Sequence, residues 1–259
     1  MRFVGAIVAI TLVSSSQAVA ADMMNPLKPG VQPVEANGWS LSLFPYLWLA
    51  GISGDVAQFG SPTINIDRSF GDILNDLDVG GMMMGEARYG QVSIVGDLVY
   101  TQISTKRHTR HGIAARSVDV TSKTFTAFLG AGYSLVENQP LNLDIVGGAR
   151  VWHVDTEIDI DGGLFNDFSA KDGATWVDAM AGLRFNYSIT SELYLTGWSF
   201  VGAGGSDLGW DVAGAVGYKF NENFSMLAGY RSLGVDYNND GYVFNIVQSG
   251  PILGFSARF

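Results

Sequence analysis

His153 and Asp155 are the two residues of this sequence whose types and spacing could activate a water molecule. They stand two positions apart, so in a strand both side chains point to the same face. An imidazole beside a carboxylate is an arrangement that serves general-base hydrolysis. What the pair can do depends on which face of which element carries it.

A second set of candidates consists of charged residues that occur singly in otherwise apolar or small-residue stretches. An isolated charge removed from water costs several kcal/mol, so charges gathered in a confined space are expected to pair with opposite charges. Such a set predicts either an ion-pair network that fills a lumen or a charged constriction that selects solutes. Its members are Glu86, Arg88, Asp97, Asp144, Arg150, Asp178, Arg184, Asp211, Lys219 and Arg258.

The elements that must position these charges are strands, because apolar and polar residues alternate with a period of two. In 173–189, for example, Val177, Ala179 and Leu183 alternate with Asp178 and Arg184. Short turns alternate with longer loops along the chain, which is typical of outer-membrane barrels. The pattern predicts an all-β fold, an antiparallel up-and-down transmembrane β-barrel of ten strands, with eight as the alternative. The expected strands are 39–50, 79–89, 91–105, 117–136, 140–158, 173–189, 192–202, 208–220, 223–235 and 247–259.

The two ends of the chain indicate the compartment. Arg2, an apolar run and Ala18-Val19-Ala20 are typical of a secretory signal peptide at 1–20. The proline-containing segment 21–37 is predicted to be a periplasmic linker, which leaves 38–259 for the barrel and the cell outer membrane as the location. The last strand presents an alternating apolar face that resembles the signal by which outer-membrane barrels are recognised for assembly. This predicted signal comprises Leu253, Phe255 and Phe259.

The composition excludes some kinds of partner. The chain is 47% hydrophobic but only 15% charged, against about 25% in an average soluble domain, and it contains no cysteine. A barrel accounts for this because its apolar residues occupy alternate positions. The formal net charge of −10 argues against nucleic acid as a partner. We expect neither a cofactor nor a resident metal.

Three further features lie in the loops and at the predicted strand ends. A basic patch predicts contact with lipopolysaccharide phosphates. Within the first loop, 52–78, residues 69–78 carry apolar residues at helical spacing and predict one or two amphipathic turns, whose role the sequence leaves open. Aromatic residues such as Tyr46, Trp48 and Trp152 fit interfacial girdles. The basic patch includes Lys106, Arg107, Arg110 and Arg116.

Several short motifs together resemble a group of proteobacterial outer-membrane β-barrel proteins that has no settled biochemical role. The resemblance covers essentially the mature chain, implies the barrel fold and says almost nothing about activity. Its motifs are Phe44-Pro45-Tyr46-Leu47-Trp48, Ser69-Phe70-Gly71-Asp72-Ile73-Leu74, Glu86-Ala87-Arg88-Tyr89-Gly90, Gly96-Asp97-Leu98-Val99-Tyr100, Gly229-Tyr230-Arg231 and Gly250-Pro251-Ile252-Leu253-Gly254.

These observations predict an integral outer-membrane barrel with a structural or interaction role at the cell envelope. A narrow porin for small solutes is the first alternative, and a hydrolase at the barrel rim is the second. Proteases of the omptin family place His and Asp residues at the rim, but parity puts His153 on the lipid-facing side with Ile145 and Val151. We therefore expect no enzyme activity. The expected partners are outer-membrane lipid, lipopolysaccharide and the barrel assembly machinery, with the protein as a monomer.

Overall fold

The structure, a computed structural model, describes residues 38–108, 115–162 and 168–259. The predicted signal peptide and linker lie outside these residues. The described chain is almost entirely antiparallel strand, with one short helix. Its elements are β1 (Ser40–Trp48), β2 (Gly51–Ala57), β3 (Ile64–Arg68), α1 (Phe70–Asp76), β4 (Leu77–Tyr89), β5 (Val92–His108), β6 (Ala115–Asn138), β7 (Leu141–Gly162), β8 (Phe168–Ser188), β9 (Leu193–Gly204), β10 (Leu208–Lys219), β11 (Phe224–Asn239) and β12 (Tyr242–Arg258).

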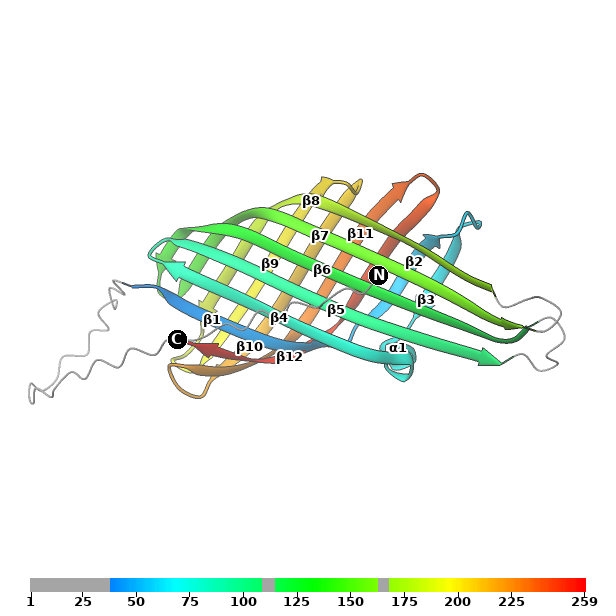
Figure 1. The fold of residues 1–259 in the computed structure, drawn as a ribbon. Helices are drawn as coiled ribbons and strands as arrows, with labels where there is room; N and C mark the ends of the chain where they lie inside the picture. Colours follow the sequence, from blue (N-terminus) through cyan, green and yellow to red (C-terminus); the bar gives the residue numbers. More distant parts are fainter. Residues whose placement is uncertain (1–37, 109–114, 163–167) are drawn as a thin grey trace, which may run out of the picture. The chain divides into compact units, whose positions relative to one another are not determined.

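Ten of these strands form a closed ring, in the order β1, β4, β5 and onward to β12, which pairs with β1 again (Figure 1). At the closing seam, Leu41 and Phe259 exchange backbone hydrogen bonds of 3.1 and 2.8 Å. A closed ring leaves no strand edge facing lipid, where an unpaired backbone group would cost several kcal/mol. The prediction of a ten-strand up-and-down barrel is confirmed.

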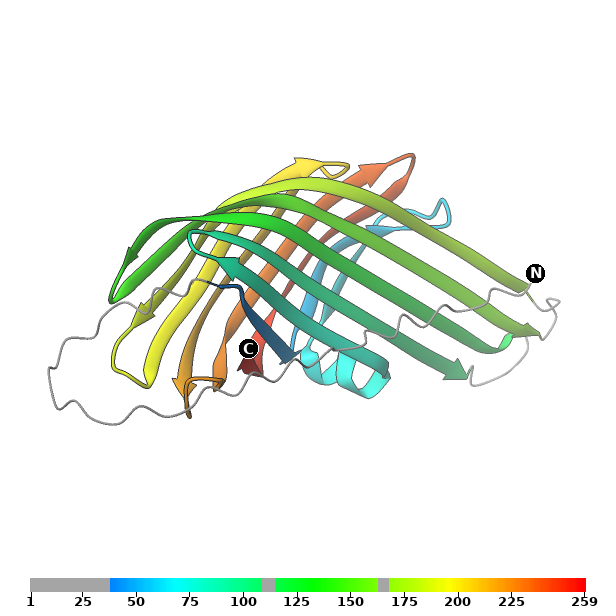
Figure 2. The same cartoon turned by 60° about the vertical axis from the view of Figure 1, so that its left-hand side comes forward.

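The strand ends at the short turns are called periplasmic below and the opposite ends extracellular, because outer-membrane barrels keep their short turns in the periplasm. The extracellular ends of several strands extend further than the sequence predicted. β6, β7 and β8 contain 24, 22 and 21 residues, whereas β9 and β10 contain 12 each. Figure 2 shows β5 to β8 as a sheet that projects beyond the shorter strands. The long gap predicted between the strands 223–235 and 247–259 is wrong, because β11 and β12 meet at a two-residue turn. Asp240 and Gly241 in this turn have φ values of 49° and 84°, as a type I′ hairpin turn requires.

The segment after β1 contains more regular structure than predicted. β12 pairs with β1 as far as Trp48, and further out it pairs with β2, which in turn pairs with β3. The chain leaves the ring at Leu49 and Ala50. Gly250 permits this crossing, since a Cβ at that position would lie only 2.1 Å from the Leu49 carbonyl oxygen.

The amphipathic turns predicted within 69–78 form helix α1. Ser69 caps the helix: its hydroxyl accepts the Asp72 backbone N–H, and the Asp72 carboxylate accepts the Ser69 N–H in return. No residue of α1 is buried. Among the residues that the structure describes, no helix is long and apolar enough to cross a membrane.

The two faces of the ring differ in polarity as the alternation predicted. In β8, Val177 and Leu183 are exposed on the outer face, while Asp178 between them is completely buried inside. Aromatic side chains such as Trp39 and Tyr89, whose rings lie 5.5 Å apart, surround the end that carries the short turns. An apolar wall with an aromatic band is what a bilayer demands of a barrel. Exposed apolar residues of the wall include Leu47, Met83, Ile94, Leu98, Leu129, Val177, Leu183, Val201, Val212, Val216 and Leu253.

Candidate functional site

The interior of the barrel is the candidate site, because the predicted charges converge there. Viewed from the periplasmic end outward, the inward-facing residues form four successive layers. They are a first ion cluster, an apolar layer that includes Val95, Phe128 and Val146, a second ion cluster, and an aromatic layer. Side chains therefore fill much of the lumen, as expected of a narrow barrel.

The second ion cluster is centred on Arg231 of β11 and is called the Arg231 cluster below. Its guanidinium donates to Asp97 of β5 over 2.5 Å and to Asp211 of β10 over 2.7 and 3.0 Å. It also donates over 2.5 Å to the hydroxyl of Tyr46, which itself donates to Asp97 over 2.8 Å. Arg150 of β7 joins the cluster by an ion pair of 2.5 Å with Asp211. Since β5 and β10 lie five places apart in the ring of ten, the cluster bridges the lumen.

The Arg231 cluster is removed from solvent. Arg231 is 0% exposed and Asp211 is 1% exposed. The Arg231 guanidinium also lies 5.0 Å from the ring of Trp48 and 5.6 Å from the ring of Trp198, within the range of cation–π attraction. Two guanidinium groups and two carboxylates make the set electrically neutral, and this balance permits its burial.

The first ion cluster lies nearer the periplasmic end and is partly open to solvent. Arg88 pairs with Asp144 and, over 2.8 Å, with Glu86, while Arg184 pairs with Glu86 over 2.6 Å and with Asp144 over 3.1 Å. The Ser134 hydroxyl donates to Asp144 over 2.7 Å. The side chains of Arg88, Glu86 and Arg184 are 21–25% exposed, so their pairing is screened more than that of Arg231.

Three members of the predicted charge set make no ion pair within the described residues. Asp178 is buried and accepts the backbone N–H of Ser206 over 2.8 Å. Lys219 lies 5.5 Å above the ring of Tyr194. Arg258 is exposed, and its expected place in a lumen network is not what the structure shows. Arg231, the central residue of the second ion cluster, is not among the predicted charges.

The aromatic layer lies on the extracellular side of the Arg231 cluster. Trp176 stacks on Tyr237 with a 4.1 Å centroid separation and on Trp152 at 5.8 Å, and Phe244 meets both tryptophan rings edge-on. Trp152 and Trp48 are 1% and 5% exposed. Their assignment to an interfacial girdle is therefore wrong, because they face the lumen.

The β2–β3 hairpin contributes contacts at the extracellular mouth. The Gln58 amide donates to the Tyr242 hydroxyl over 2.9 Å, and the backbone N–H of Phe59 donates to Asp172 over 2.5 Å. Tyr242 belongs to β12 and Asp172 to β8, so the hairpin tip contacts two separate sides of the mouth.

The candidate hydrolytic pair lies on the outer face, as parity predicted. His153 is exposed, and its ring nitrogens contact Thr175 at 2.7 Å and Asp155 at 3.2 Å. Asp155 also pairs with Lys171 over 3.1 Å. These four side chains form a hydrogen-bonded surface cluster on β7 and β8, outside the lumen.

The remaining predicted residues fall at the ends of strands. Leu253, Phe255 and Phe259 face outward on or directly after β12. Lys106 and Arg107 fall at the end of β5 and Arg116 at the start of β6, while Arg110 lies outside the described residues.

Asp78 is an exposed residue at the extracellular end of β4. The Ser104 hydroxyl and the Gln102 amide donate to Asp78 over 2.5 and 3.1 Å. These hydrogen bonds favour the ionised carboxylate and hold the pKa of Asp78 below its ordinary value.

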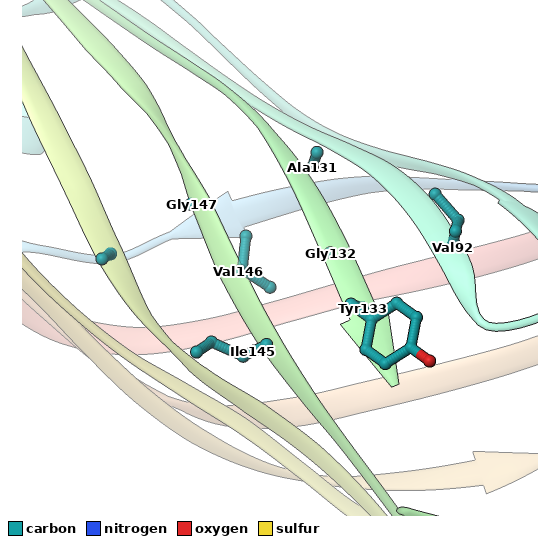
Figure 3. Close-up of a pocket in the computed structure, with 8 residues that line it drawn as sticks. Val92, Ala131, Gly132, Tyr133, Ile145, Val146 and Gly147 are labelled. Atoms are coloured by element: carbon teal, nitrogen blue, oxygen red, sulfur yellow. The ribbon is translucent and has the colours of Figure 1, made fainter. Parts of the chain in front are cut away.

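A hollow of about 420 Å³ lies on the lipid-facing wall near the periplasmic end (Figure 3). Its floor is formed by Ala131, Gly147 and Ala181, which are directly opposite one another on β6, β7 and β8. Tyr133 and Ile145 border it. The residues that line the hollow are almost all apolar, so it does not bring together the side chains that a catalytic or metal site needs.

Comparison with known proteins places the fold but not the activity. No protein-family model matches the chain, and no curated protein matches its sequence. The outer membrane protease OmpT from Escherichia coli is similar in structure, with a TM-score of 0.52 and 11% identity, covering 88% of this chain and 99% of OmpT. Ail of Yersinia pestis, crystallised with a heparin analogue, has a TM-score of 0.40 and 15% identity, covering 86% and 99%. A major outer membrane protein from Thermus thermophilus has a TM-score of 0.42 and 12% identity, covering 85% and 99%.

The similarity to OmpT shows a shared barrel fold, and at 11% identity it says nothing about a shared activity. The closed ring of ten strands and the apolar outer wall characterise an integral β-barrel of the outer membrane. In barrels of this kind the short turns face the periplasm, so the opposite ends of β5 to β8 project outside the cell.

Proposed function

We propose that this protein is a non-enzymatic outer-membrane barrel with a closed lumen, and that it serves a structural or interaction role at the cell envelope. The observation that carries the proposal is the Arg231 cluster, which joins β1, β5, β7, β10 and β11 across the barrel interior. A solute passing through the barrel would have to separate these buried partners.

The energetics support closure at this level. Removing one partner of a buried ion pair costs about 3–5 kcal/mol, because the remaining charge is left in a medium of low dielectric constant. Arg231 holds two carboxylates and the Tyr46 hydroxyl at once. The aromatic layer around Trp152 and Trp176 adds a second obstruction immediately outside it.

The extracellular sheet supports a role at the cell surface. β5 to β8 extend far beyond β9 and β10, although closing the lumen requires no such extension. Their projecting parts offer paired strands with exposed side chains such as Lys171 to molecules outside the cell. We also propose contact with lipopolysaccharide phosphates near the basic patch, and a monomeric barrel.

Planar-bilayer recording of the purified, folded protein tests the closed lumen. We expect no discrete conductance steps at moderate voltage. A matched variant with Arg231→Ala and Trp48→Ala removes the central cation and the ring beneath it, and its steps would show that inserted protein is detectable. Discrete steps from the unaltered protein would refute closure and favour the narrow porin.

The geometry of His153 bears on the hydrolase alternative. Its partners Asp155 and Thr175 lie with it on the outer face, away from the mouth where an extracellular substrate could be enclosed. We expect the purified protein to show no peptidase activity that is lost in His153→Ala. An activity abolished by that substitution, but kept in a variant of the exposed Glu222 at a distant turn, would refute the non-enzymatic assignment.

A further inference from the structure

Five buried charges alternate in sign across the lumen. In order they are Asp97, Arg231, Asp211, Arg150 and Asp178. The first three links are direct ion pairs of 2.5, 2.7 and 2.5 Å. The fourth link differs: Arg150 and Asp178 are paired directly across β7 and β8, yet among the described residues they form no ion pair within 4.0 Å.

Several buried polar atoms of the lumen lack a hydrogen-bond partner among the described residues, and four of them belong to residues at or next to this fourth link. Arg150 Nε and Nη1, Asp178 Oδ2 and Ser206 Oγ are all buried, and none has a hydrogen-bond partner among the described residues. Arg150 and Asp178 are 2% and 0% exposed. Leaving a single buried polar atom unsatisfied costs about 1–3 kcal/mol. These four atoms include hydrogen-bond donors and an acceptor. A small molecule that both donates and accepts hydrogen bonds would therefore satisfy them.

The backbone leaves space beside two of these atoms. Gly209 at the start of β10 has no side chain, and a Cβ there would lie 3.5 Å from Asp178 Oδ2, 3.6 Å from Met180 Sδ and 3.8 Å from Ser206 Oγ. Any residue other than glycine at position 209 would place a side chain in this space. Buried water usually makes about three hydrogen bonds and is found where polar groups surround such a space.

We propose that ordered water occupies this space and bridges Arg150 to Asp178 and Ser206. The other oxygen of Asp178 already accepts the backbone N–H of Ser206 over 2.8 Å. The bridge therefore connects the Arg231 cluster to the short loop between β9 and β10. The bridge anchors that loop at the barrel interior. This role does not depend on what the barrel binds outside the cell.

A crystal structure at a resolution that shows ordered water tests the bridge directly. We expect at least one water molecule within hydrogen-bonding distance of both Asp178 Oδ2 and the Arg150 guanidinium. A direct Arg150–Asp178 ion pair, or a dry space beside Gly209, would overturn the proposal.

Amide hydrogen exchange of Ser206 in the folded barrel tests the coupling. In Asp178→Ala the acceptor is lost, and exchange should accelerate about tenfold or more, as expected for a charge-assisted hydrogen bond. In Asp207→Ala, a change of the exposed neighbouring carboxylate, exchange should not change.

The decisive variant is Arg150→Met, which leaves Asp178 and the loop in place but also removes the ion pair with Asp211. Asp211→Asn, which weakens the same ion pair and leaves Arg150 beside Asp178, is therefore its control. Exchange at Ser206 is compared between the two variants. We expect faster exchange at Ser206 in Arg150→Met than in the control, because water no longer links Asp178 to a cation. Unchanged exchange in a folded Arg150→Met protein would overturn the bridge. This result is independent of the closed lumen, which fails only if the unaltered protein conducts.

Discussion

Replacing Arg231 by methionine removes the central cation of the Arg231 cluster while retaining a long apolar side chain. Asp211 keeps Arg150 as a partner, but Asp97 loses its cation and Tyr46 loses a donor. A buried carboxylate left without its cation costs about 3–5 kcal/mol. We expect the free energy of unfolding to fall by that amount in Arg231→Met.

The assay is equilibrium urea unfolding of the barrel in lipid vesicles, followed by tryptophan fluorescence. Two variants serve as controls. Arg231→Met combined with Asp97→Asn should recover most of the lost stability, since the unpaired charge is gone. Lys219→Met removes an inward cation whose contact is the Tyr194 ring, and it should cost below about 1 kcal/mol. If Arg231→Met is no less stable than Lys219→Met, the reasoning about the Arg231 cluster is refuted.

Three further predictions concern the seam, the rim and assembly. Gly250→Ala should lower the free energy of unfolding in urea by about 1–3 kcal/mol, because its Cβ would lie 2.1 Å from a backbone oxygen. Gly147→Ala is the control and should cost little, because a Cβ there has no neighbour within 4 Å. Equal effects of the two substitutions would contradict this prediction. The pKa of Asp78 is lower in the folded protein than in the unfolded chain, so its ionised carboxylate stabilises the fold at pH values above the ordinary carboxyl pKa. This stabilisation is lost as the pH falls through the pKa of Asp78 in the folded protein. Carbon NMR titration should therefore show a higher Asp78 midpoint in Ser104→Ala, and an unchanged midpoint would exclude that hydrogen bond as the cause. Phe259→Ala should reduce the fraction of protein assembled in cells but not the stability of refolded protein; normal assembly would rule out its role in the signal.

The alternation of residue types predicted the membrane-spanning part of the fold, because lipid outside and a filled lumen inside impose opposite demands on neighbouring residues. Asp97, Asp178 and Asp211 were all placed on the correct face in this way. Beyond the bilayer both faces of a strand meet water, so the period-two signal fades. The extracellular ends of β6 to β8 and of β11 were read as loops for this reason.

Alternation did not reveal Arg231, because in β11 the buried apolar residues lie on the inward face together with the arginine. The inward neighbours Leu227, Leu233 and Val235 are apolar and buried, so the apolar face of β11 reads as lipid-facing. The barrel interior has an apolar core of its own, which alternation alone does not distinguish from lipid. A lone arginine within a spanning strand is the signal that could have found this site, since such a charge must face the interior.

The unequal strand lengths give the barrel a tall side and a low side at the cell surface. β9 and β10 end after 12 residues, whereas β6 to β8 continue for about twice that length. Large molecules arriving from the medium first meet the tall β5–β8 sheet, while the sugar chains of neighbouring lipids can cover the low rim. Antibodies against the native protein should therefore recognise mainly one flank.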